Sequence, residues 1–306
     1  MSARELFSEE SSAEVVAASF DGTPDPRLRR VVQSLVRHLH DFVKDVELTE
    51  AEWETAVDFL TRTGQICSET RQEFILLSDV LGLSMLVETV NHRTGGASTE
   101  QTVLGPFHVA ASPARDLGTD IALDGKGTPC LVSGRVTGTD GTALAGARVD
   151  VWQTNEDGFY DVQQPDVQPP GNLRGIFTTD DDGRYWFRSV VPRYYPIPDD
   201  GPVGELLAAT GRHPYRPAHL HFIVSAAGHR SVTTHVFVAD SPYLDSDAVF
   251  GVKESLVRDV AEVDDPARAE AVGLPNPFRT LTFDLTLARE DEEPGSPTPA
   301  TAGGPS

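Results

Sequence analysis

The sequence of 306 residues is poor in cysteine, in basic residues and in long apolar runs, and each shortage excludes a class of protein. The two cysteines, Cys67 and Cys130, have no second thiol near them in sequence, which excludes a CxxC metal or redox pair. No apolar run is long enough to span a bilayer, which excludes a transmembrane protein. The chain also lacks a basic start followed by an apolar core. We therefore expect no secretory signal and a reduced, cytoplasmic setting.

Basic residues are outnumbered by acidic ones, and this imbalance limits the possible partners. Lysine and arginine number 25 against 47 aspartates and glutamates, so the formal net charge at pH 7 is −22. An acidic surface of this kind repels phosphate backbones and anionic lipid. We therefore expect neither nucleic acid nor a membrane as a partner. An apolar share of 39% is enough for a buried core and excludes a chain that is disordered throughout.

The first hundred residues follow a helical periodicity. Apolar residues between positions 28 and 43 recur at steps of three and four, which predicts an amphipathic helix. Thr49 and Glu52 have the spacing of a capping box, which predicts the start of a second helix. A third apolar stretch, 74–90, is so dense that we expect it to form a helix pair that is buried on most sides.

Short β-type runs separated by turn residues replace this pattern after residue 100. The predicted strands are 130–137, 147–154, 184–190, 219–226, 231–239 and 280–288. Two Asp-Gly pairs, at 140–141 and 182–183, are strong turn signals because glycine accepts a positive φ. The number of strands and their spacing are typical of a β-sandwich.

These patterns predict a mainly β protein with an all-α N-terminal part. We expect a helical domain at 1–100, a β-sandwich catalytic domain at 101–288 and a disordered acidic and proline-rich tail at 289–306. Two segments, 161–175 and 192–217, are rich in proline and glycine and too long for hairpin loops, so we expect them to build a site.

Two histidines in a predicted strand suggest a metal site. His219 and His221 are two residues apart, so their side chains point to the same face of the strand and can bind one ion. Two histidines on a solvated strand face fit the same pattern. The chain has no cysteine cluster, no His-Glu-x-x-His helix and no third histidine at ligand spacing, so a common zinc site is not predicted.

Tyrosines in the loops around this strand are the second candidate group. The chain has six tyrosines, and four of them, Tyr160, Tyr194, Tyr195 and Tyr215, lie in the flanking loops. A highly charged cation stabilises the phenolate form of tyrosine, and this hard anionic oxygen suits ferric iron. For any one of these tyrosines, a buried phenol with a satisfied hydroxyl group is the simpler interpretation.

Three segments together carry a family resemblance. They are DVWQTNEDGFY at 150–160, PRYYPIP at 192–198 and RPAHLHF at 216–222. With them the chain resembles the intradiol ring-cleaving dioxygenases over nearly its whole length. Within that family, residues 195–204 and 241–251 look most like members that cleave hydroxyquinol, and catechol-cleaving members are the nearest relatives. His235 departs from the glutamine of catechol-cleaving members, which weakens the catechol interpretation.

The resemblance implies roles for five residues. Tyr160, Tyr195, His219 and His221 would bind one non-haem ferric ion per subunit. Tyr195 would also leave the metal and act as a base when the diol binds. Arg216 cannot lose its proton at working pH, so it would stabilise the negative charge that develops on the ring.

The resemblance also implies a substrate pocket. Its lining would be Leu76, Asp79, Val103, Leu104, Gly105, Pro106, Phe107, Ile197, Pro198 and Val249. The Leu-Gly-Pro-Phe run at 104–107 would supply an apolar wall and a close approach of the backbone. Asp79 would share a helix face with Leu76 and accept a hydrogen bond from a third ring hydroxyl. A helix cap or an ion pair would explain Asp79 equally well.

The expected activity is therefore the opening of hydroxyquinol with O2 to 3-hydroxy-cis,cis-muconate, which tautomerises to maleylacetate. Cleavage of catechol or a substituted catechol to cis,cis-muconates is the alternative within the class. An iron-free, transthyretin-like binding module is the alternative from another class. In the resembling enzymes the helical part joins two subunits and can hold a phospholipid, so we expect a homodimer with a possible bound phospholipid. A plain packing face would explain the apolar stripe at 28–43 as well.

Overall fold

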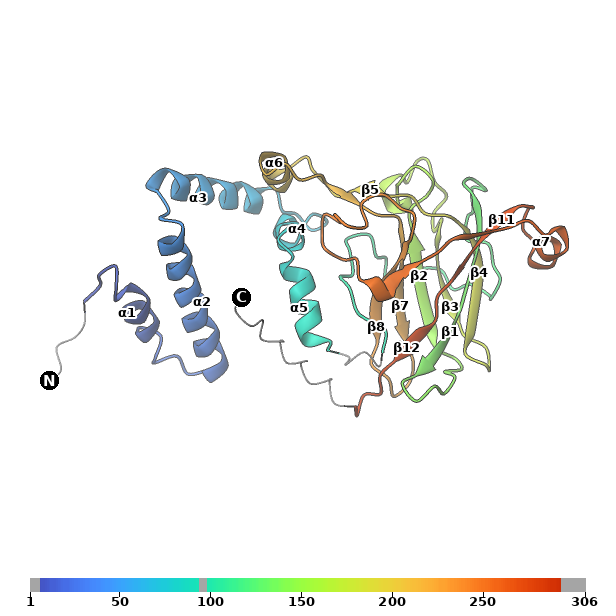
Figure 1. The fold of residues 1–306 in the computed structure, drawn as a ribbon, viewed down its shortest axis with the longest axis horizontal. Coiled ribbons are helices and arrows are strands. Elements are labelled where there is room, and N and C mark those ends of the chain that lie inside the picture. The colour runs from blue at the N-terminus through green and yellow to red at the C-terminus, as the bar shows by residue number, and fades with distance from the viewer. Residues whose placement is uncertain (1–5, 94–97, 293–306) are drawn as a thin grey trace, which may run out of the picture. The chain divides into compact units, whose positions relative to one another are not determined.

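A computed structural model describes residues 6–93 and 98–292 of the chain (Figure 1). The chain forms two compact units, and the boundary between them falls after Gln65. The helices of the predicted N-terminal domain are therefore divided between the two units. No helix within the described ranges is both long and apolar enough to cross a membrane.

The first unit consists of the helices α1 (Ser12–Ala18), α2 (Pro26–Asp45) and α3 (Glu50–Gln65). The predicted capping box of α3 is confirmed. The backbone N–H of Thr49 donates to Glu52 Oε2 at 2.9 Å, and the backbone N–H of Glu52 donates to Thr49 Oγ1 at 3.3 Å. The short helix α1 was not predicted, because seven residues are too few to show a clear period.

The predicted apolar stripe of α2 is present, but this helix has no buried residue. Six of its apolar side chains are between 44% and 55% exposed: Leu28, Val31, Leu35, Leu39, Phe42 and Val43. Among the described residues of the first unit, about half of the surface of each of these side chains is therefore left uncovered.

The second unit begins with a helix pair, as predicted for 74–90. Helix α4 (Glu73–Val80) and helix α5 (Leu83–Asn91) are separated at Gly82, whose φ of +71° ends the helical path. The prediction that this stretch is buried on most sides is wrong. Seven of its apolar side chains are 48% to 64% exposed: Phe74, Ile75, Leu81, Leu83, Leu86, Val87 and Val90. Two short helices packed on one side can bury only a narrow stripe, which here includes Val80 and Met85.

Two five-stranded sheets follow (Figure 1). In the first, β1 (Pro129–Gly138) pairs with β4 (Arg184–Val190) on one side and with β11 (Phe278–Thr282) and then β12 (Leu285–Leu287) on the other. The short strand β10 (Ala261–Val263) pairs with β11 at the edge. The single strand predicted at 280–288 is therefore two strands.

The second sheet has the order β3-β2-β7-β8-β9. Its strands are β3 (Arg174–Thr178), β2 (Arg148–Gln153), β7 (His219–Ser225), β8 (Val232–Val238) and β9 (Val257–Arg258). The prediction missed β3 and β9. Strand β3 has only five residues and starts inside the segment that composition assigned to a loop.

The two sheets share one hydrophobic core, which confirms the predicted sandwich. Alternate residues of β2 and β7 enter it, among them Val149, Val151, Leu220 and Phe222. Because side chains alternate along a strand, the residues between them face away from the core. The outer face of the second sheet therefore carries Arg148, Asp150, Trp152, His219 and His221.

The long segments contain short elements that sequence patterns did not reveal. Segment 161–175 begins with η1 (Asp161–Gln163), and segment 192–217 contains β5 (Tyr195–Pro196), α6 (Pro202–Ala209) and β6 (Tyr215–Arg216). Further along the chain lie η2 (Glu254–Leu256) and α7 (Pro266–Val272). Of the predicted tail, Arg289 forms a β-bridge with His229, and residues 293–306 lie outside the described residues.

Candidate metal centre

Three aromatic side chains form a row across the outer face of the second sheet. Strand register places Trp152 of β2 opposite His221 of β7, and His221 opposite His235 of β8. The Trp152 and His221 rings stack with centroids 4.5 Å apart and an interplanar angle of 14°. The segment before β1 covers this face, since the backbone N–H of Thr102 donates to the carbonyl of Thr233. All three side chains of the row are buried.

Three histidines converge at one point of this face. Each of His219, His221 and His235 offers a ring nitrogen within 4.8 Å of the other two. The Nε2 atoms of His219 and His221 are 3.2 Å apart. His219 Nδ1 lies 2.7 Å from the carbonyl oxygen of Pro217, which can only accept, so Nδ1 carries the proton and Nε2 keeps its lone pair for a ligand.

The two predicted tyrosine ligands approach the same point. Tyr160 Oη lies 2.8 Å from His221 Nε2. The Tyr195 ring stands perpendicular to the Tyr160 ring at 5.4 Å and lies 5.5 Å from the His219 ring, measured between centroids. Tyr160 is fully buried and Tyr195 is 3% exposed. The structure thus brings together all four residues that the resemblance assigns to a metal.

The other two tyrosines of the loops do not join this group. Tyr194 and Tyr215 form a separate aromatic cluster with Tyr243, in which the rings of Tyr215 and Tyr243 stack at 4.9 Å. Adjacent residues of an extended chain point in opposite directions, so Tyr194 and Tyr195 face different surroundings. The gathering of four tyrosines in the sequence therefore reflects two distinct clusters.

Local backbone features explain how Tyr160 and Tyr195 reach the site. Tyr195 pairs with Arg216 in the short β5–β6 ladder, which places this loop beside the start of β7. Gly158, with φ +87°, lies so close to the Tyr194 carbonyl that an added Cβ would be 2.9 Å from its oxygen. The Tyr160 ring is stacked on Phe107 with centroids 4.6 Å apart.

Burial sets the protonation states of the cluster in the absence of a metal. It lowers the pKa of His219, His221 and His235 well below the ordinary value of 6.5, and the positive charge of Arg216 acts in the same direction. Burial and the neighbouring Tyr195 raise the pKa of Tyr160 well above 10. The imidazoles are therefore neutral and ready to bind a cation, whereas the Tyr160 phenol becomes a ligand only when a strong cation displaces its proton.

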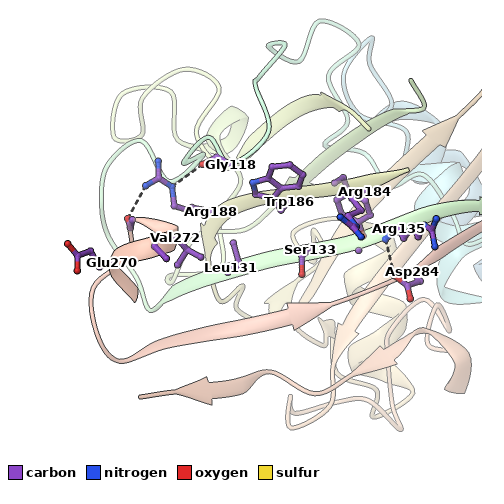
Figure 2. A pocket seen from close by; sticks show the side chains of 14 residues that line it. Gly118, Leu131, Ser133, Arg135, Arg184, Trp186, Arg188, Glu270, Val272 and Asp284 are labelled. Atoms are coloured by element: carbon purple, nitrogen blue, oxygen red, sulfur yellow. Dashed lines mark hydrogen bonds between the residues drawn. The ribbon is translucent and has the colours of Figure 1, made fainter. Parts of the chain in front are cut away.

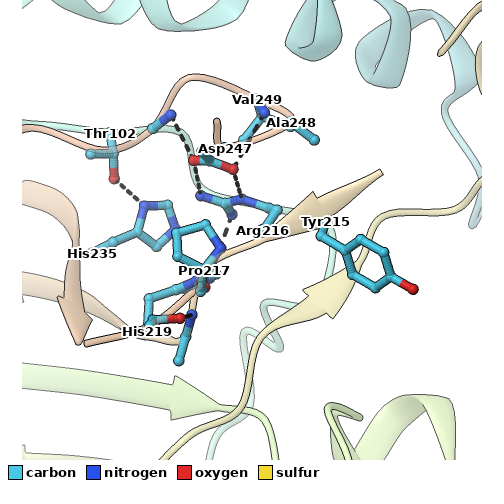
Figure 3. Close-up of polar contacts among 12 residues, drawn as sticks. Thr102, Tyr215, Arg216, Pro217, His219, His235, Asp247, Ala248 and Val249 are labelled. Carbon is cyan, nitrogen blue, oxygen red and sulfur yellow. Dashed lines mark hydrogen bonds and ion pairs between the residues drawn. The ribbon is translucent and has the colours of Figure 1, made fainter. Parts of the chain in front are cut away.

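A buried guanidinium group lies beside the histidines (Figure 3). Arg216 Nη1 is 3.5 Å from His219 Nε2, and Arg216 Nε donates to Asp247 Oδ1 at 3.1 Å. Burial acts to lower the pKa of Arg216, but the carboxylate of Asp247 and the phenol of Tyr195 outweigh it and hold that pKa above its ordinary value. The site therefore contains a permanent positive charge next to the candidate ligands.

Three of the predicted pocket residues belong to one small apolar core. Ile197 and Val249 are buried with Val80 in a small apolar core, against which Leu76 packs. Half-buried Asp79 is close enough to Arg216 for the two charges to interact; burial raises the pKa of this carboxyl group, and Arg216 opposes the rise.

The backbone of the Leu-Gly-Pro-Phe run lies close to His221. Gly105 has φ +77°, and a Cβ at this position would be 3.1 Å from His221 Cε1. Phe107 covers Tyr160 as described above. Leu104, Pro106 and Pro198 are exposed and Val103 is half-buried, so their part in a pocket stays a prediction.

Sequence reasoning did not assign three residues of this site: His235, Asp247 and Trp152. The prediction that no third histidine stands at ligand spacing is wrong, because the register of β7 and β8 places His235 opposite His221. His235 was noted in the sequence only for the glutamine it replaces. Its Nδ1 shares a hydrogen bond with Thr102 Oγ1 at 2.6 Å, and its buried Nε2 has no hydrogen-bond partner in the part of the chain that the structure describes. No sequence signal indicated that Asp247 would meet Arg216.

A surface pocket of about 820 Å³ lies elsewhere, on the outer face of the first sheet (Figure 2). Its lining includes Leu131, Ser133, Trp186, Arg188 and Glu270. Among these residues, Arg188 donates hydrogen bonds to the backbone carbonyls of Gly118 and Gly273. None of the predicted site residues lines this pocket, and the chemistry that the sequence predicts therefore belongs to the second sheet.

Comparison with known families defines the class of the protein. Residues 25–99 match the family model "Catechol dioxygenase N terminus" and residues 103–289 match the model "Dioxygenase". The chain belongs to the intradiol ring-cleavage dioxygenases. This membership accounts for the helical part followed by a sheet-rich catalytic part.

Individual relatives narrow the class. The chain is 57% identical to hydroxyquinol 1,2-dioxygenase of Rhizobium sp. (strain MTP-10005) over 92% of this chain and 96% of the relative. It is similar to the crystal structure of hydroxyquinol 1,2-dioxygenase from Pseudomonas putida DLL-E4, with a TM-score of 0.87, 49% identity, and coverage of 92% of this chain and 99% of that one. Catechol 1,2-dioxygenase of Acinetobacter radioresistens is more distant, at 29% identity and a TM-score of 0.79, covering 94% and 97% of the two chains.

Proposed function

We propose that this protein opens the ring of hydroxyquinol with O2 to give 3-hydroxy-cis,cis-muconate and, by tautomerisation, maleylacetate. The main support is the convergence of two buried tyrosines and two buried histidines beside a buried arginine, with Tyr160 Oη 2.8 Å from His221 Nε2. Relatives named as hydroxyquinol 1,2-dioxygenases that are 46% to 57% identical to the chain favour hydroxyquinol over catechol.

We propose Tyr160, Tyr195, His219 and His221 as the ligands of one ferric ion per subunit. Two phenolates and two neutral imidazoles are a donor set that suits a hard, highly charged cation. Such an ion, when bound, would supply a Lewis acid that accepts electron density from the ring oxygens of the substrate. His235 is not included, because the family resemblance places a glutamine at its position in catechol-cleaving members.

The residues of the chain have separate tasks in this proposal. Tyr195 Oη would accept a proton from a substrate hydroxyl. Arg216, fixed and positively charged, would stabilise negative charge as it develops on the ring. Asp79 would accept a hydrogen bond from the third hydroxyl of hydroxyquinol, a contact that catechol cannot make. The apolar side chains of Ile197 and Val249 would keep water away from the ring.

Oxygen uptake by the purified protein, with hydroxyquinol and with catechol in parallel, tests the proposal. The ultraviolet spectrum of the product identifies the bond that was cleaved. Fast uptake with hydroxyquinol and slow uptake with catechol are expected. The reverse preference would keep the ferric site and overturn the account of the pocket. A protein without stoichiometric iron and without uptake on either substrate would favour the iron-free binding module.

We further propose a cytoplasmic homodimer that is joined through the N-terminal helices and can bind a phospholipid there. The exposed apolar stripe of α2 supports this, because a stripe that is half exposed in one chain gains most from a partner. Sedimentation of the wild type and of Leu35→Glu measures the assembly. We expect a dimer for the wild type and a monomer for the variant, and two identical profiles would contradict the dimer surface. Mass spectrometry of a solvent extract detects any bound lipid.

A further inference from the structure

Asp247 is a buried carboxylate to which the proposed reaction gives no task. Its side chain and that of Arg216 are 1% and 3% exposed. Asp247 Oδ1 accepts from Arg216 Nε at 3.1 Å, and Oδ2 accepts from Arg216 Nη2 at 3.3 Å. The two-pronged contact fixes the plane of the guanidinium group and leaves Nη1 facing His219. The contact therefore determines where the positive charge of Arg216 points.

The same carboxylate shapes the loop that carries it, residues 243–251. The backbone N–H groups of Val249 and Gly251 donate to Asp247 at 3.4 Å and 2.8 Å. The loop is also tied to the strand of Arg216, because the N–H of Ala248 donates to the carbonyl of Tyr215 at 3.1 Å. Figure 3 shows Asp247 and Val249 on this loop beside the guanidinium group. Asp247 is thus held in place from both sides.

Two bulky residues near the ends of the 243–251 loop have a left-handed backbone. Tyr243 has φ +70° and Phe250 has φ +58°, a conformation that is rare for aromatic side chains. Tyr243 is held by its stack on Tyr215, and the guanidinium group of Arg212 lies 4.9 Å from the centre of the Phe250 ring. A conformation of this kind persists only where the surroundings determine it fully, and it is commonly found next to functional groups.

Gly251 completes the arrangement by leaving space. A Cβ at this position would lie 2.8 Å from Arg216 Nη2 and 3.1 Å from Asp247 Oδ2. A side chain here would therefore push the guanidinium group and its carboxylate partner apart. The absence of a side chain at residue 251 is part of how Arg216 is held.

We propose that Asp247, on the 243–251 loop, is the positioning residue that aims Arg216 at the ring of the bound substrate. Asp247 touches neither the candidate metal ligands nor the ring in this role; it acts through Arg216. The inference rests on the proposed function, since it concerns the charge that Arg216 would stabilise during ring opening.

A double-mutant cycle separates this role from a purely structural one. The variants are Asp247→Asn, Arg216→Gln and the combination of both, each loaded with iron and assayed for kcat and KM with hydroxyquinol. We expect Asp247→Asn to lower kcat about 100-fold and to change KM by less than about threefold. Iron content and the visible absorption of the iron-loaded protein stay as in the wild type. In the Arg216→Gln background the second substitution lowers kcat by less than about threefold, because its route of action is already lost.

Two other variants secure the interpretation. Gly251→Ala keeps Asp247 but displaces the guanidinium group, and we expect it to lower kcat while iron is retained. Asp247→Asn leaves the charge of Arg216 without its partner and can prevent folding. In that case, Gly251→Ala alone tests whether the position of Arg216 determines kcat. Asp245→Asn, an exposed change in the same loop, is the matched control and should keep wild-type kcat.

Each of the following kinetic results would overturn the proposal: an unchanged kcat in Gly251→Ala, an unchanged kcat in Asp247→Asn, or fold-losses of the two single variants that multiply in the double variant. Loss of iron from Asp247→Asn would point to a structural role instead and would also overturn it. Failure of the proposed function gives a different signature, because the wild type itself would then not consume oxygen with hydroxyquinol.

Discussion

The outer faces of the two sheets are built by the same alternation of side chains, but one face is open to solvent and the other is buried. On the first sheet, Arg184 and Trp186 stand on a surface open to solvent, and Arg188 is bonded to backbone carbonyls. On the second sheet, Trp152 and His235 are covered by other segments, and each has a buried nitrogen without a hydrogen-bond partner among the described residues. Polar groups are expensive to bury unpaired, so a face of the second kind indicates a site.

The difference lies in what covers each sheet. The segment before β1 and the loops of residues 155–175 and 192–217 close over the second sheet, whereas the 820 Å³ pocket leaves the first sheet open (Figure 2). When a polar face is covered, the electrostatic interactions between its charged groups become stronger, because water no longer screens them. Strand alternation therefore determines which side chains share a face of the sheet. The loops that cover or expose this face determine whether those side chains form a buried site.

Removing a histidine from the covered face should have the largest effect. We expect His221→Ala to lower kcat/KM by more than about 1,000-fold and to reduce bound iron, because the proposed ferric site would lose one of its ligands. Arg184→Ala, at an outward position of the first sheet, should change kcat/KM by less than about twofold. Oxygen uptake and iron analysis of the two variants measure the contrast. Full activity in His221→Ala would contradict the placement of the metal site on the outer face of the second sheet.

Two tryptophans allow the same comparison for stability. Trp152 is 1% exposed and stacks on His221, whereas Trp186 is 36% exposed. We expect Trp152→Ala to lower the free energy of unfolding by about 3–5 kcal/mol, since it leaves a cavity beneath the histidine. Trp186→Ala should cost less, about 1–2 kcal/mol, because part of its ring is open to solvent. Denaturant unfolding of both variants provides the values, and equal losses would contradict the different packing of the two faces.

Acid should destabilise the protein through the covered histidines. Burial lowers the pKa of His219, His221 and His235 in the folded state, while the unfolded chain takes up protons below about pH 6.5. Their contribution to stability is therefore nearly constant well above that pH and falls below it, with a slope that approaches about 1.4 kcal/mol per pH unit for each histidine.

The measurement is unfolding of the metal-free protein between about pH 6.5 and 5.5, a window chosen above the ordinary carboxyl pKa values. His235→Gln is the matched variant, because it removes one of the three buried imidazoles. The unfolded imidazole is about half protonated at pH 6.5 and almost fully protonated at pH 5.5, so we expect the two curves to diverge by about 1 kcal/mol across this window. Parallel curves would mean that burial does not lower the pKa of His235 in the folded protein.

The sequence carried enough information for the centre of this site and too little for its surroundings. His219 and His221 were predictable because strand alternation is local, and the resemblance assigned Tyr160 and Tyr195. Asp247 was not predictable, because its contact with Arg216 spans 31 residues and depends on how a loop folds.

The helices illustrate the same limit. The capping box at Thr49 and the helix pair at 74–90 follow from local spacing, and both predictions are confirmed. The prediction that this helix pair is buried on most sides was wrong, because a high content of apolar residues does not reveal which part of the protein covers a helix. The short elements β5 and α6 were hidden in a segment whose proline and glycine content indicated only a loop. Local pairing with Arg216, rather than composition, determines that Tyr195 enters the site.

The smallest expected effect concerns the preference of the proposed site for hydroxyquinol over catechol. Asp79 is half-buried near Arg216, and we propose that it accepts a hydrogen bond from the third hydroxyl of hydroxyquinol. Asp79→Ala should lower the ratio of kcat/KM for hydroxyquinol to that for catechol by about tenfold, because catechol never makes this contact. Ser84→Ala is the control, since it removes a polar neighbour of Asp79 and leaves the carboxylate in place. An unchanged ratio in Asp79→Ala would mean that this carboxylate serves the packing of α4, and that substrate choice lies with the apolar side chains around Ile197 and Val249.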